Sequence, residues 1–171
     1  MRRLMLLRHA EAGRPEGVDD HDRPLTPHGR KQSAEMGKYL ARQGWTPQLA
    51  LISTAKRTQE TWRFVLAAAQ HEIIQLDEPG LYEAALDSLI EVVRKTPPAV
   101  GTLLLVGHNP GFERLAKSLA GSGRPAALSR LQREYPTAGL AIIDFAMDDW
   151  SHVKAQSGYL ERFESLATIS H

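Results

Sequence analysis

Short runs of consecutive apolar residues alternate along this chain with polar segments whose apolar residues recur every three or four positions. Four such polar segments carry the spacing of amphipathic helices. The apolar runs have the length of strands buried within a sheet, and they lie at residues 4–7, 48–52, 73–76, 102–106 and 140–145. This alternation predicts an α/β fold, a three-layer α/β/α sandwich around a mostly parallel sheet.

Several polar residues mark where the predicted helices begin and end. Thr26 is the expected N-cap of the first helix, because a proline follows it, and Gly44 is its expected end. Ser53 is the expected N-cap of the second helix. Asn109 is the expected N-cap of the fourth, with a proline at the first helical position.

The last third of the chain has a weaker pattern. Residues 121–136 have mixed polarity and two prolines, and they are expected to form a lid or excursion with room for a short helix. Residues 151–155 are predicted to be a strand antiparallel to 140–145, because the connection between them is short. The tail from residue 159 is expected to be a terminal helix or loosely ordered.

Composition narrows the class of protein. The chain has 171 residues, a formal charge of +1 and no cysteine. We therefore expect one domain over residues 1–171, without disulfides or thiolate metal sites, and no nucleic-acid or membrane partner. The N-terminal apolar run is too short for a signal peptide, so a cytoplasmic location is expected. The sequence leaves the oligomeric state open.

Candidate chemistry appears where three predicted strands end. Arg8 and His9 follow the first strand, Ser53 and Arg57 follow the second, and His108 follows the fourth. The carboxyl ends of parallel strands meet at one edge of a sheet, so these side chains are expected to share one crevice. Arginines and helix N-termini together form an anion site, to which histidines add a nucleophile or proton carrier.

Four segments together resemble the histidine phosphatase superfamily. Residues 7–10 (Leu-Arg-His-Ala) resemble its Arg-His-Gly signature, with alanine where glycine is commoner, and residues 25–29 (Leu-Thr-Pro-His-Gly) resemble its Leu-Thr-x-x-Gly segment. Residues 53–61 resemble its Ser-x-x-x-Arg-Thr-x-Glu-Thr segment, and residues 106–111 (Val-Gly-His-Asn-Pro-Gly) the segment with its second histidine. The short chain and residues 81–84 are most similar to the SixA-type phosphohistidine phosphatases.

The resemblance implies a phosphoglycerate mutase-like fold and a metal-independent phosphatase that needs no cofactor. His9 would attack phosphorus and form a phosphohistidine intermediate, which water then hydrolyses. The implied phosphate ligands are Arg8, Arg57 and His108, with Ser53 and Asn109 as secondary ligands. The proton donor stays open between Glu83, where the wider superfamily often has its acid, and Asp20, in the loop after the first strand.

Three functions compete. The first is a phosphatase for phosphohistidine on a phosphorylated protein of the histidine phosphotransfer type. The alternatives are a small-molecule phosphomonoesterase of the same superfamily and a non-catalytic phosphate-binding module. Two less specific interpretations accompany them: Arg57 could pair with Glu60 on a solvated helix face, and His9, His108 and Asp20 could bind a metal. The arginines argue against a metal, because they would repel a cation.

Overall fold

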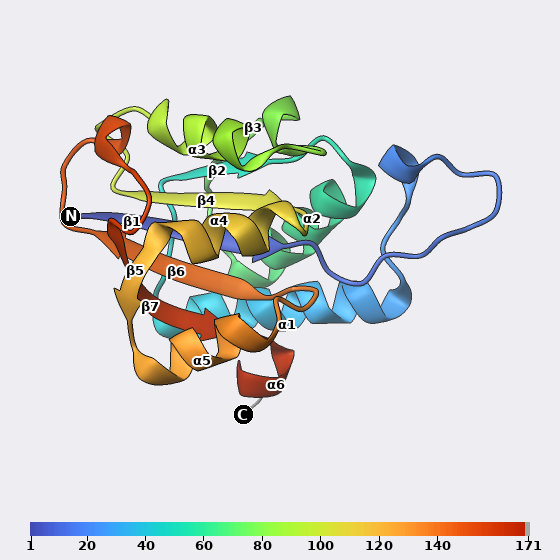
Figure 1. Ribbon diagram of the computed structural model, residues 1–171. Coiled ribbons are helices and arrows are strands. Elements are labelled where there is room, and N and C mark those ends of the chain that lie inside the picture. Colours follow the sequence, from blue (N-terminus) through green and yellow to red (C-terminus); the bar gives the residue numbers. More distant parts are fainter. Residues whose placement is uncertain (170–171) are drawn as a thin grey trace.

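A seven-stranded sheet with strand order β3-β2-β4-β1-β6-β7-β5 forms the centre of the molecule (Figure 1). The computed structural model describes residues 1–169. Only β6 runs antiparallel to its neighbours β1 and β7, so the predicted mostly parallel sheet is confirmed. The strands are β1 (Arg2–Arg8), β2 (Leu49–Ile52), β3 (Ile74–Asp77), β4 (Thr102–Gly107), β5 (Ala120–Gly123), β6 (Leu140–Phe145) and β7 (Gly158–Glu164).

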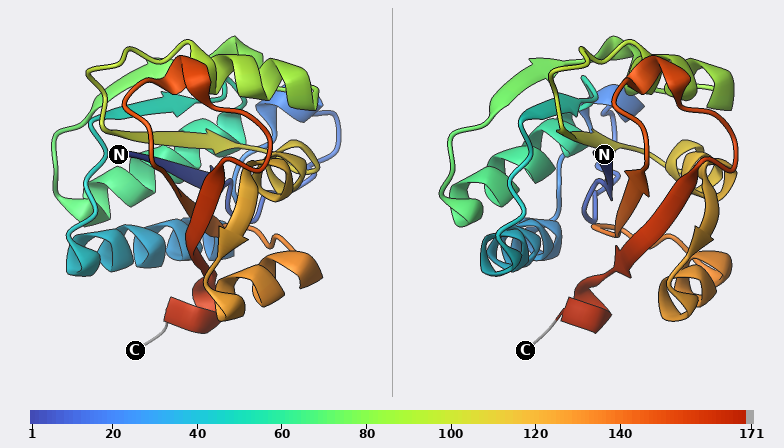
Figure 2. Two further views of the ribbon diagram at one scale, coloured as in Figure 1. Left: turned by 60° about the vertical axis from the view of Figure 1, so that its left-hand side comes forward. Right: turned by 90° about the vertical axis from the view of Figure 1, so that its left-hand side faces the viewer.

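Helices cover both faces of this sheet, as the two views of Figure 2 show. One face packs against α1 (Pro27–Gln43), α2 (Lys56–Ala69) and α6 (Leu166–Ile169). The other face packs against α3 (Leu86–Arg94), α4 (Gly111–Leu119) and α5 (Pro125–Arg133). Short 3-10 turns are η1 (Asp20–Asp22), η2 (Pro79–Leu81) and η3 (Trp150–His152). The predicted three-layer α/β/α sandwich is therefore confirmed.

The central strand β1 shows why its apolar run has no polar gap. Leu4 and Leu6 belong to the core under α3, α4 and α5, whereas Met5 and Leu7 belong to the core under α1 and α2. All four side chains are fully buried. Since each contributes about 1.5–3 kcal/mol on burial, the strand is anchored from both faces, and its polar continuation is carried to the sheet edge.

The first helix has the predicted ends, but two other helix starts differ. Thr26 Oγ1 accepts a hydrogen bond from the Gly29 N–H at 3.0 Å, and Gly44 ends α1 with φ of 69°. The cap predicted at Ser53 is wrong, because α2 begins at Lys56 with Ala55 as N-cap. Similarly, α4 begins at Gly111 with Pro110 as N-cap, although Asn109 Oδ1 still accepts from the Glu113 N–H at 3.2 Å.

The C-terminal third contains the main corrections. The short helix expected within residues 121–136 is confirmed as α5, which packs on the core, but the expected lid is wrong, since the segment also contributes most of β5, which pairs with β7. The strand expected at residues 151–155 is also wrong: η3 buries Trp150, whose indole N–H donates to the Val100 carbonyl at 2.7 Å. The antiparallel partner of β6 is instead β7, in the expected tail.

The tail ends in the short helix α6, and residues 170–171 lie outside the described part. Residues 159–164 lack the continuous apolar run of a buried strand because charged Glu161 and Arg162 interrupt their apolar positions. Both are only half-buried in the structure, while Leu160 and Phe163 are buried in the core. Within residues 1–169, no helix has the length and apolar character needed to cross a bilayer.

Candidate active site

His9 lies where the chain leaves the sheet at the end of β1. Its main-chain N–H donates to the Gly107 carbonyl at the end of β4, and its own carbonyl accepts from the Ala138 N–H, both at 3.0 Å. These two bonds tie the histidine to β4 on one side and to the loop before β6 on the other. Its side chain is buried, at 8% exposure, so its position is defined by the fold rather than by a free loop.

The ends of β1, β2 and β4 lie side by side, because these strands are parallel neighbours in the sheet. A cavity of about 370 Å³ opens at this edge. The structure brings together in its wall all four principal candidates, with Asn109 and both candidate acids: Arg8, His9, Arg57, His108, Asn109, Glu83 and Asp20. This placement at the carboxyl edge is usual for ligand sites in open α/β sheets.

The protonation of His9 is set by its surroundings. Its Nδ1 lies 2.7 Å from the Ala10 carbonyl oxygen, which can only accept, so Nδ1 carries the proton and Nε2 keeps a free lone pair. Burial, assisted by the charges of Arg57 and Arg8, lowers the pKa of His9 to about 4. The ring is therefore neutral at neutral pH, as a nucleophile must be.

His108 is held by Ser53. The Oγ of Ser53 lies 2.7 Å from Nε2 of His108, and Ser53 is fully buried. Burial also lowers the pKa of His108, to about 3. Ser53 is not among the residues in the cavity wall, so the geometry gives it contact with His108 rather than with a ligand. The rings of His108 and His9 lie beside each other, tilted by 55°, with centroids 5.4 Å apart.

Asn109 lines the cavity, but both ends of its amide are engaged. Its Nδ2 donates to the Tyr135 carbonyl at 2.9 Å, and its Oδ1 receives the Glu113 N–H of α4. The same Tyr135 carbonyl accepts from Nη1 of Arg8, also at 2.9 Å. Tyr135 thus links Asn109 to Arg8, which fixes the wall of the cavity.

Two arginines give the cavity its positive charge. Arg57, which is only 6% exposed, donates from Nη1 to the Asp20 carbonyl at 2.7 Å. The pairing of Arg57 with Glu60 on a solvated face is therefore wrong; Glu60 accepts from the Leu25 N–H instead. The Nε atoms of Arg8 and Arg57 are buried and have no hydrogen-bond partner within residues 1–169. Free buried guanidinium donors in one cavity are typical of a phosphate site.

Asp20 is surrounded by donors. Its Oδ2 accepts from the Tyr82 hydroxyl at 2.5 Å and from Arg57 Nη2 at 3.1 Å, and its Oδ1 accepts from Arg23 Nη1 at 2.9 Å. The Tyr82 and Arg23 hydrogen bonds, with the smaller contribution of Arg57, hold the pKa of this carboxyl well below its usual range. The same contact raises the pKa of Tyr82 to about 12. Asp20 is thus ionised in this arrangement.

Glu83 lies at the rim of the cavity with an exposed side chain. Its φ of 51° falls in the left-handed region, which a residue with a long side chain seldom adopts. Such a conformation costs free energy and persists where the surrounding structure imposes it, often at functional sites.

Four further residues of the cavity wall were not among the candidate site residues: Arg14, Arg23, Tyr82 and Pro110. Tyr82 precedes Glu83 directly, and Arg23 lies three residues after Asp20, so their neighbours in sequence were the available signal. Arg14 lies in a polar loop that contains no pattern pointing to a site.

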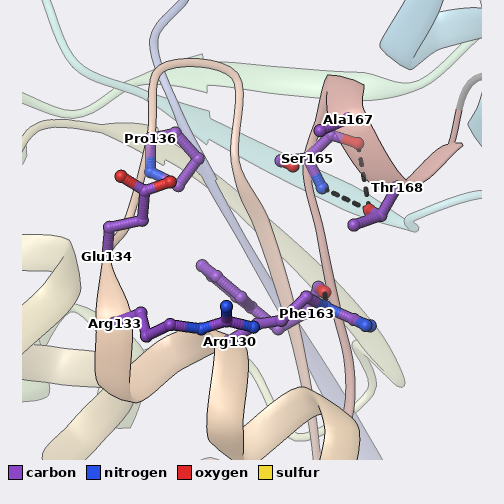
Figure 3. A pocket seen from close by; sticks show the side chains of 8 residues that line it. All are labelled: Arg130, Arg133, Glu134, Pro136, Phe163, Ser165, Ala167 and Thr168. Atoms are coloured by element: carbon purple, nitrogen blue, oxygen red, sulfur yellow. Dashed lines mark hydrogen bonds between the residues drawn. The ribbon is translucent and has the colours of Figure 1, made fainter.

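A second cavity, of about 360 Å³, lies between α5 and the C-terminal end of β7 (Figure 3). Its Arg130 is engaged by the Phe163 carbonyl at 2.9 Å and by Glu164 at 3.2 Å, and its Thr168 hydroxyl accepts from the Ser165 N–H. Its wall holds neither histidine nor a cluster of free donors. The candidate catalytic residues are therefore gathered at the cavity on the sheet edge and not here.

The family follows from comparison with known proteins. Residues 4–92, more than half of the chain, match the model of the histidine phosphatase superfamily (branch 1). The chain belongs to the histidine phosphatase superfamily. This histidine phosphatase is 35% identical over 150 residues to the uncharacterized protein Rv1276c of Mycobacterium tuberculosis, covering 86% of this chain and 92% of that protein.

Solved structures of the superfamily share the fold. A protein assigned as phosphohistidine phosphatase SixA from Agrobacterium tumefaciens is 27% identical, with a TM-score of 0.81 over 96% of this chain and 97% of that one. A SixA assigned from Nakamurella multipartitia is 29% identical, with a TM-score of 0.77 over 95% of each chain. The phosphoglycerate mutase-like architecture expected from the sequence is confirmed.

Proposed function

We propose that this histidine phosphatase hydrolyses phosphohistidine on a phosphorylated protein, without a metal, through a covalent intermediate on His9. The observation that supports it most is the pairing of His9 Nδ1 with the Ala10 carbonyl, which leaves Nε2 free inside an arginine-lined cavity. The arginines supply the positive charge that a metal would otherwise bring to a phosphoryl group. The similarity to proteins assigned as SixA supports the choice of substrate.

The reaction has two steps. Nε2 of His9 attacks phosphorus, and the bond between phosphorus and the leaving nitrogen breaks; the electron pair stays on that nitrogen, which takes a proton from the general acid. A water molecule then attacks phosphorus and gives its proton back to the same carboxylate. The bond between phosphorus and His9 breaks, inorganic phosphate leaves, and neutral His9 is restored.

Charge stabilisation would come from Arg8, Arg57 and His108 around the equatorial phosphoryl oxygens. In the described part of the chain, the buried Nε atoms of both arginines and the buried Nδ1 of His108 have no hydrogen-bond partner, and as N–H donors they would be available for this use. Ser53 would not contact the phosphoryl group itself but would position His108. Asn109 would likewise help Tyr135 to position Arg8. This assignment replaces direct phosphate contact by Ser53 with a positioning role.

Glu83 is the better candidate for the general acid. Asp20 is bound by Tyr82, Arg23 and Arg57, and its lowered pKa keeps it ionised, which is the wrong state for donating a proton. Within residues 1–169, no hydrogen bond or ion pair engages the Glu83 carboxyl. Its place at the cavity rim would let it reach the leaving atom.

The test is phosphate release from a phosphohistidine protein and from an aryl phosphate, without added metal, by wild type and His9→Ala. We expect release by wild type, faster from the phosphohistidine protein, and none by His9→Ala. An exposed histidine on α1, His28, offers a matched control, and His28→Ala should behave like wild type. Trapping of an acid-labile phosphoenzyme in wild type would separate catalysis from binding alone.

Two results would favour a different function from the one proposed. Release from the aryl phosphate alone would favour a small-molecule phosphomonoesterase. Phosphate binding without release from either substrate would indicate a phosphate-binding module. Unchanged release by His9→Ala would exclude His9 as the nucleophile.

A further inference from the structure

Tyr82 connects two parts of the cavity wall that lie far apart in the chain. It directly follows η2, and its hydroxyl donates to Oδ2 of Asp20, 62 positions earlier, at 2.5 Å. Both residues line the cavity at the sheet edge. The two steps of the proposed reaction give Tyr82 no role, so this contact needs an explanation of its own.

The aromatic ring of Tyr82 has contacts that do not involve its hydroxyl. It meets the rings of His108 and His21 edge to face, with centroids 5.5 Å and 4.8 Å apart. In addition, Cζ of Arg57 lies 5.9 Å from the ring centroid. A phenylalanine would keep all three contacts, so the hydroxyl can be removed while the ring stays in the wall of the cavity.

The three donors that bind the Asp20 carboxylate differ in distance. The bond from Tyr82, at 2.5 Å, has the length of a strong hydroxyl–carboxylate bond, and the bond from Arg23 Nη1, at 2.9 Å, is within the usual range for a guanidinium donor. The bond from Arg57 Nη2, at 3.1 Å, is longer than such charge-assisted bonds usually are. Of the three, Arg57 is the partner that the carboxylate can release most easily.

Arg57 keeps its position without that bond. Its Nη1 donates to the main-chain carbonyl of Asp20 at 2.7 Å, a contact that does not depend on the carboxylate. A phosphoryl group can therefore take Nη2 while the Asp20 carboxylate keeps its bonds to Tyr82 and Arg23. The carboxylate and the phosphoryl group are then two anions beside one arginine, and they repel each other.

The hydroxyl of Tyr82 decides how strongly the carboxylate competes. Without it, Oδ2 of Asp20 would keep Arg57 as its one hydrogen-bond donor in the described part of the chain. The carboxylate would then hold the same guanidinium that a phosphoryl group needs. The contact with Asp20 raises the pKa of Tyr82 to about 12, so the hydroxyl keeps its proton and remains a donor at neutral pH.

We propose that Tyr82 is a positioning residue for phosphoryl binding: with Arg23, its hydroxyl retains the Asp20 carboxylate and so leaves Arg57 to the phosphoryl group. This inference rests on the proposed function, because it places the phosphoryl group at Arg57. It adds a residue that acts through Asp20 rather than on the substrate. The hydroxyl should therefore matter only while position 20 carries a negative charge.

A double-mutant cycle of Tyr82→Phe and Asp20→Asn tests this dependence. Calorimetry measures the binding of inorganic phosphate without any need for turnover. Tyr82→Phe should weaken phosphate binding about five- to tenfold, the range for loss of one hydrogen bond to a charged group, and kcat/KM for an aryl phosphate should fall by the same factor. In the Asp20→Asn background, the same Tyr82→Phe change should alter neither quantity.

An exposed tyrosine on β7 provides the matched control. Tyr159 lies outside the cavity wall, and Tyr159→Phe should change neither phosphate binding nor kcat/KM. Unchanged phosphate binding in Tyr82→Phe would overturn the proposal. Tighter binding would also overturn it, because Tyr82 would then hold Asp20 against Arg57. An equal loss in both backgrounds would show that the hydroxyl acts independently of Asp20, which contradicts the proposal as well.

The two measurements separate this inference from the proposed function. If wild type binds phosphate but releases none from the aryl phosphate or from a phosphohistidine protein, the proposed function fails, and the calorimetric cycle still decides the role of Tyr82. If wild type hydrolyses these substrates and the cycle shows no dependence on Asp20, the phosphatase stands and the positioning role is overturned.

Discussion

The carboxylate of Asp20 and the guanidinium of Arg57 form an ion pair in the wall of the cavity at the sheet edge, with 3.1 Å between Oδ2 and Nη2. The main-chain carbonyl of Asp20 takes the other terminal nitrogen of the same arginine. Both terminal nitrogens of Arg57 thus donate hydrogen bonds to one residue of the segment before α1. A phosphoryl group that binds Arg57 in a bidentate manner must therefore share it with Asp20 or displace the carboxylate.

This pair predicts opposite effects for the two candidate acids. Asp20→Asn should keep turnover of an aryl phosphate and tighten inhibition by inorganic phosphate, because a negative charge beside the phosphate is removed. Glu83→Gln should lower turnover of the aryl phosphate by roughly 10²-fold, the lower range for loss of a general acid. Steady-state kinetics with phosphate as competitive inhibitor measures both. The choice of Glu83 would be contradicted if Asp20→Asn lowered turnover of the aryl phosphate, or if neither variant lowered it.

The low pKa values of His9 and His108 predict that the stability of the folded state falls as the pH is lowered. Burial lowers the pKa of His9 to about 4 and that of His108 to about 3, whereas an unfolded histidine titrates near 6.5. The unfolded chain therefore binds more protons as the pH falls below about 6.5, and the folded state loses stability down to about pH 3, the folded pKa of His108. Denaturant unfolding from pH 7 to pH 4 would show the decline.

A His9 variant tests whether this loss of stability at low pH comes from the buried histidines. His9→Gln removes one of the two groups, so its stability should fall less steeply over the same pH range than that of wild type. NMR titration gives the direct value, and His9 should protonate near pH 4. A His9 midpoint near 6.5 would show that the ring is exposed to solvent or paired with an anion, and would remove the argument for a neutral nucleophile.

The contact between Ser53 and His108 predicts a positioning effect. Ser53→Ala removes the partner of Nε2, 2.7 Å away, and should lower kcat/KM about tenfold, the equivalent of one hydrogen bond of roughly 1.4 kcal/mol. Inorganic phosphate should also bind more weakly, because His108 is no longer held in one orientation. The measurement is kcat/KM and phosphate inhibition at several pH values.

Thr58 provides the control for Ser53. Its buried hydroxyl bonds to the carbonyls of Ser53 and Ala55 and does not touch His108. Thr58→Ala should lower stability without a change in phosphate inhibition. If both variants lose activity in proportion to stability, Ser53 has only a structural role.

The sequence predicted what depends on local pattern. Continuous apolar runs such as residues 102–106 identified the inner strands, since both faces of those strands are covered. Thr26 and Gly44 identified the ends of α1 because their chemistry is local. The order of the inner strands in a parallel sheet then placed the polar residues that follow them at one edge, namely Arg8, His9, Arg57 and His108.

What the sequence could not predict depends on distant partners. β7 carries half-buried Glu161 and Arg162, so its pattern resembles a polar tail until the sheet is known. Ser53 looked like a helix cap because its partner His108 is 55 positions away. The ionised state of Asp20 likewise depends on Tyr82, 62 positions away, and no local pattern reports such a contact.

The close packing of Gly29 against Glu11 predicts that a larger residue at position 29 destabilises the fold. A Cβ at this position would lie 2.1 Å from the Glu11 carbonyl oxygen, which is main chain and cannot move aside cheaply. The same Glu11 also receives the Thr26 hydroxyl at 2.7 Å on its carboxylate, so the start of α1 is packed against the chain just after His9. Gly29→Ala should therefore destabilise the fold by about 1–3 kcal/mol.

Thermal unfolding measures this effect. For a chain of this length, the loss corresponds to a fall in Tm of roughly 2–12 °C. Gly13, in the loop between His9 and α1, is the control: a Cβ there would have no neighbour closer than 3.8 Å, and Gly13→Ala should leave Tm unchanged. Equal Tm values for Gly29→Ala and wild type would show that the junction can shift. The close approach of α1 to Glu11 would then not be needed to hold His9 in place.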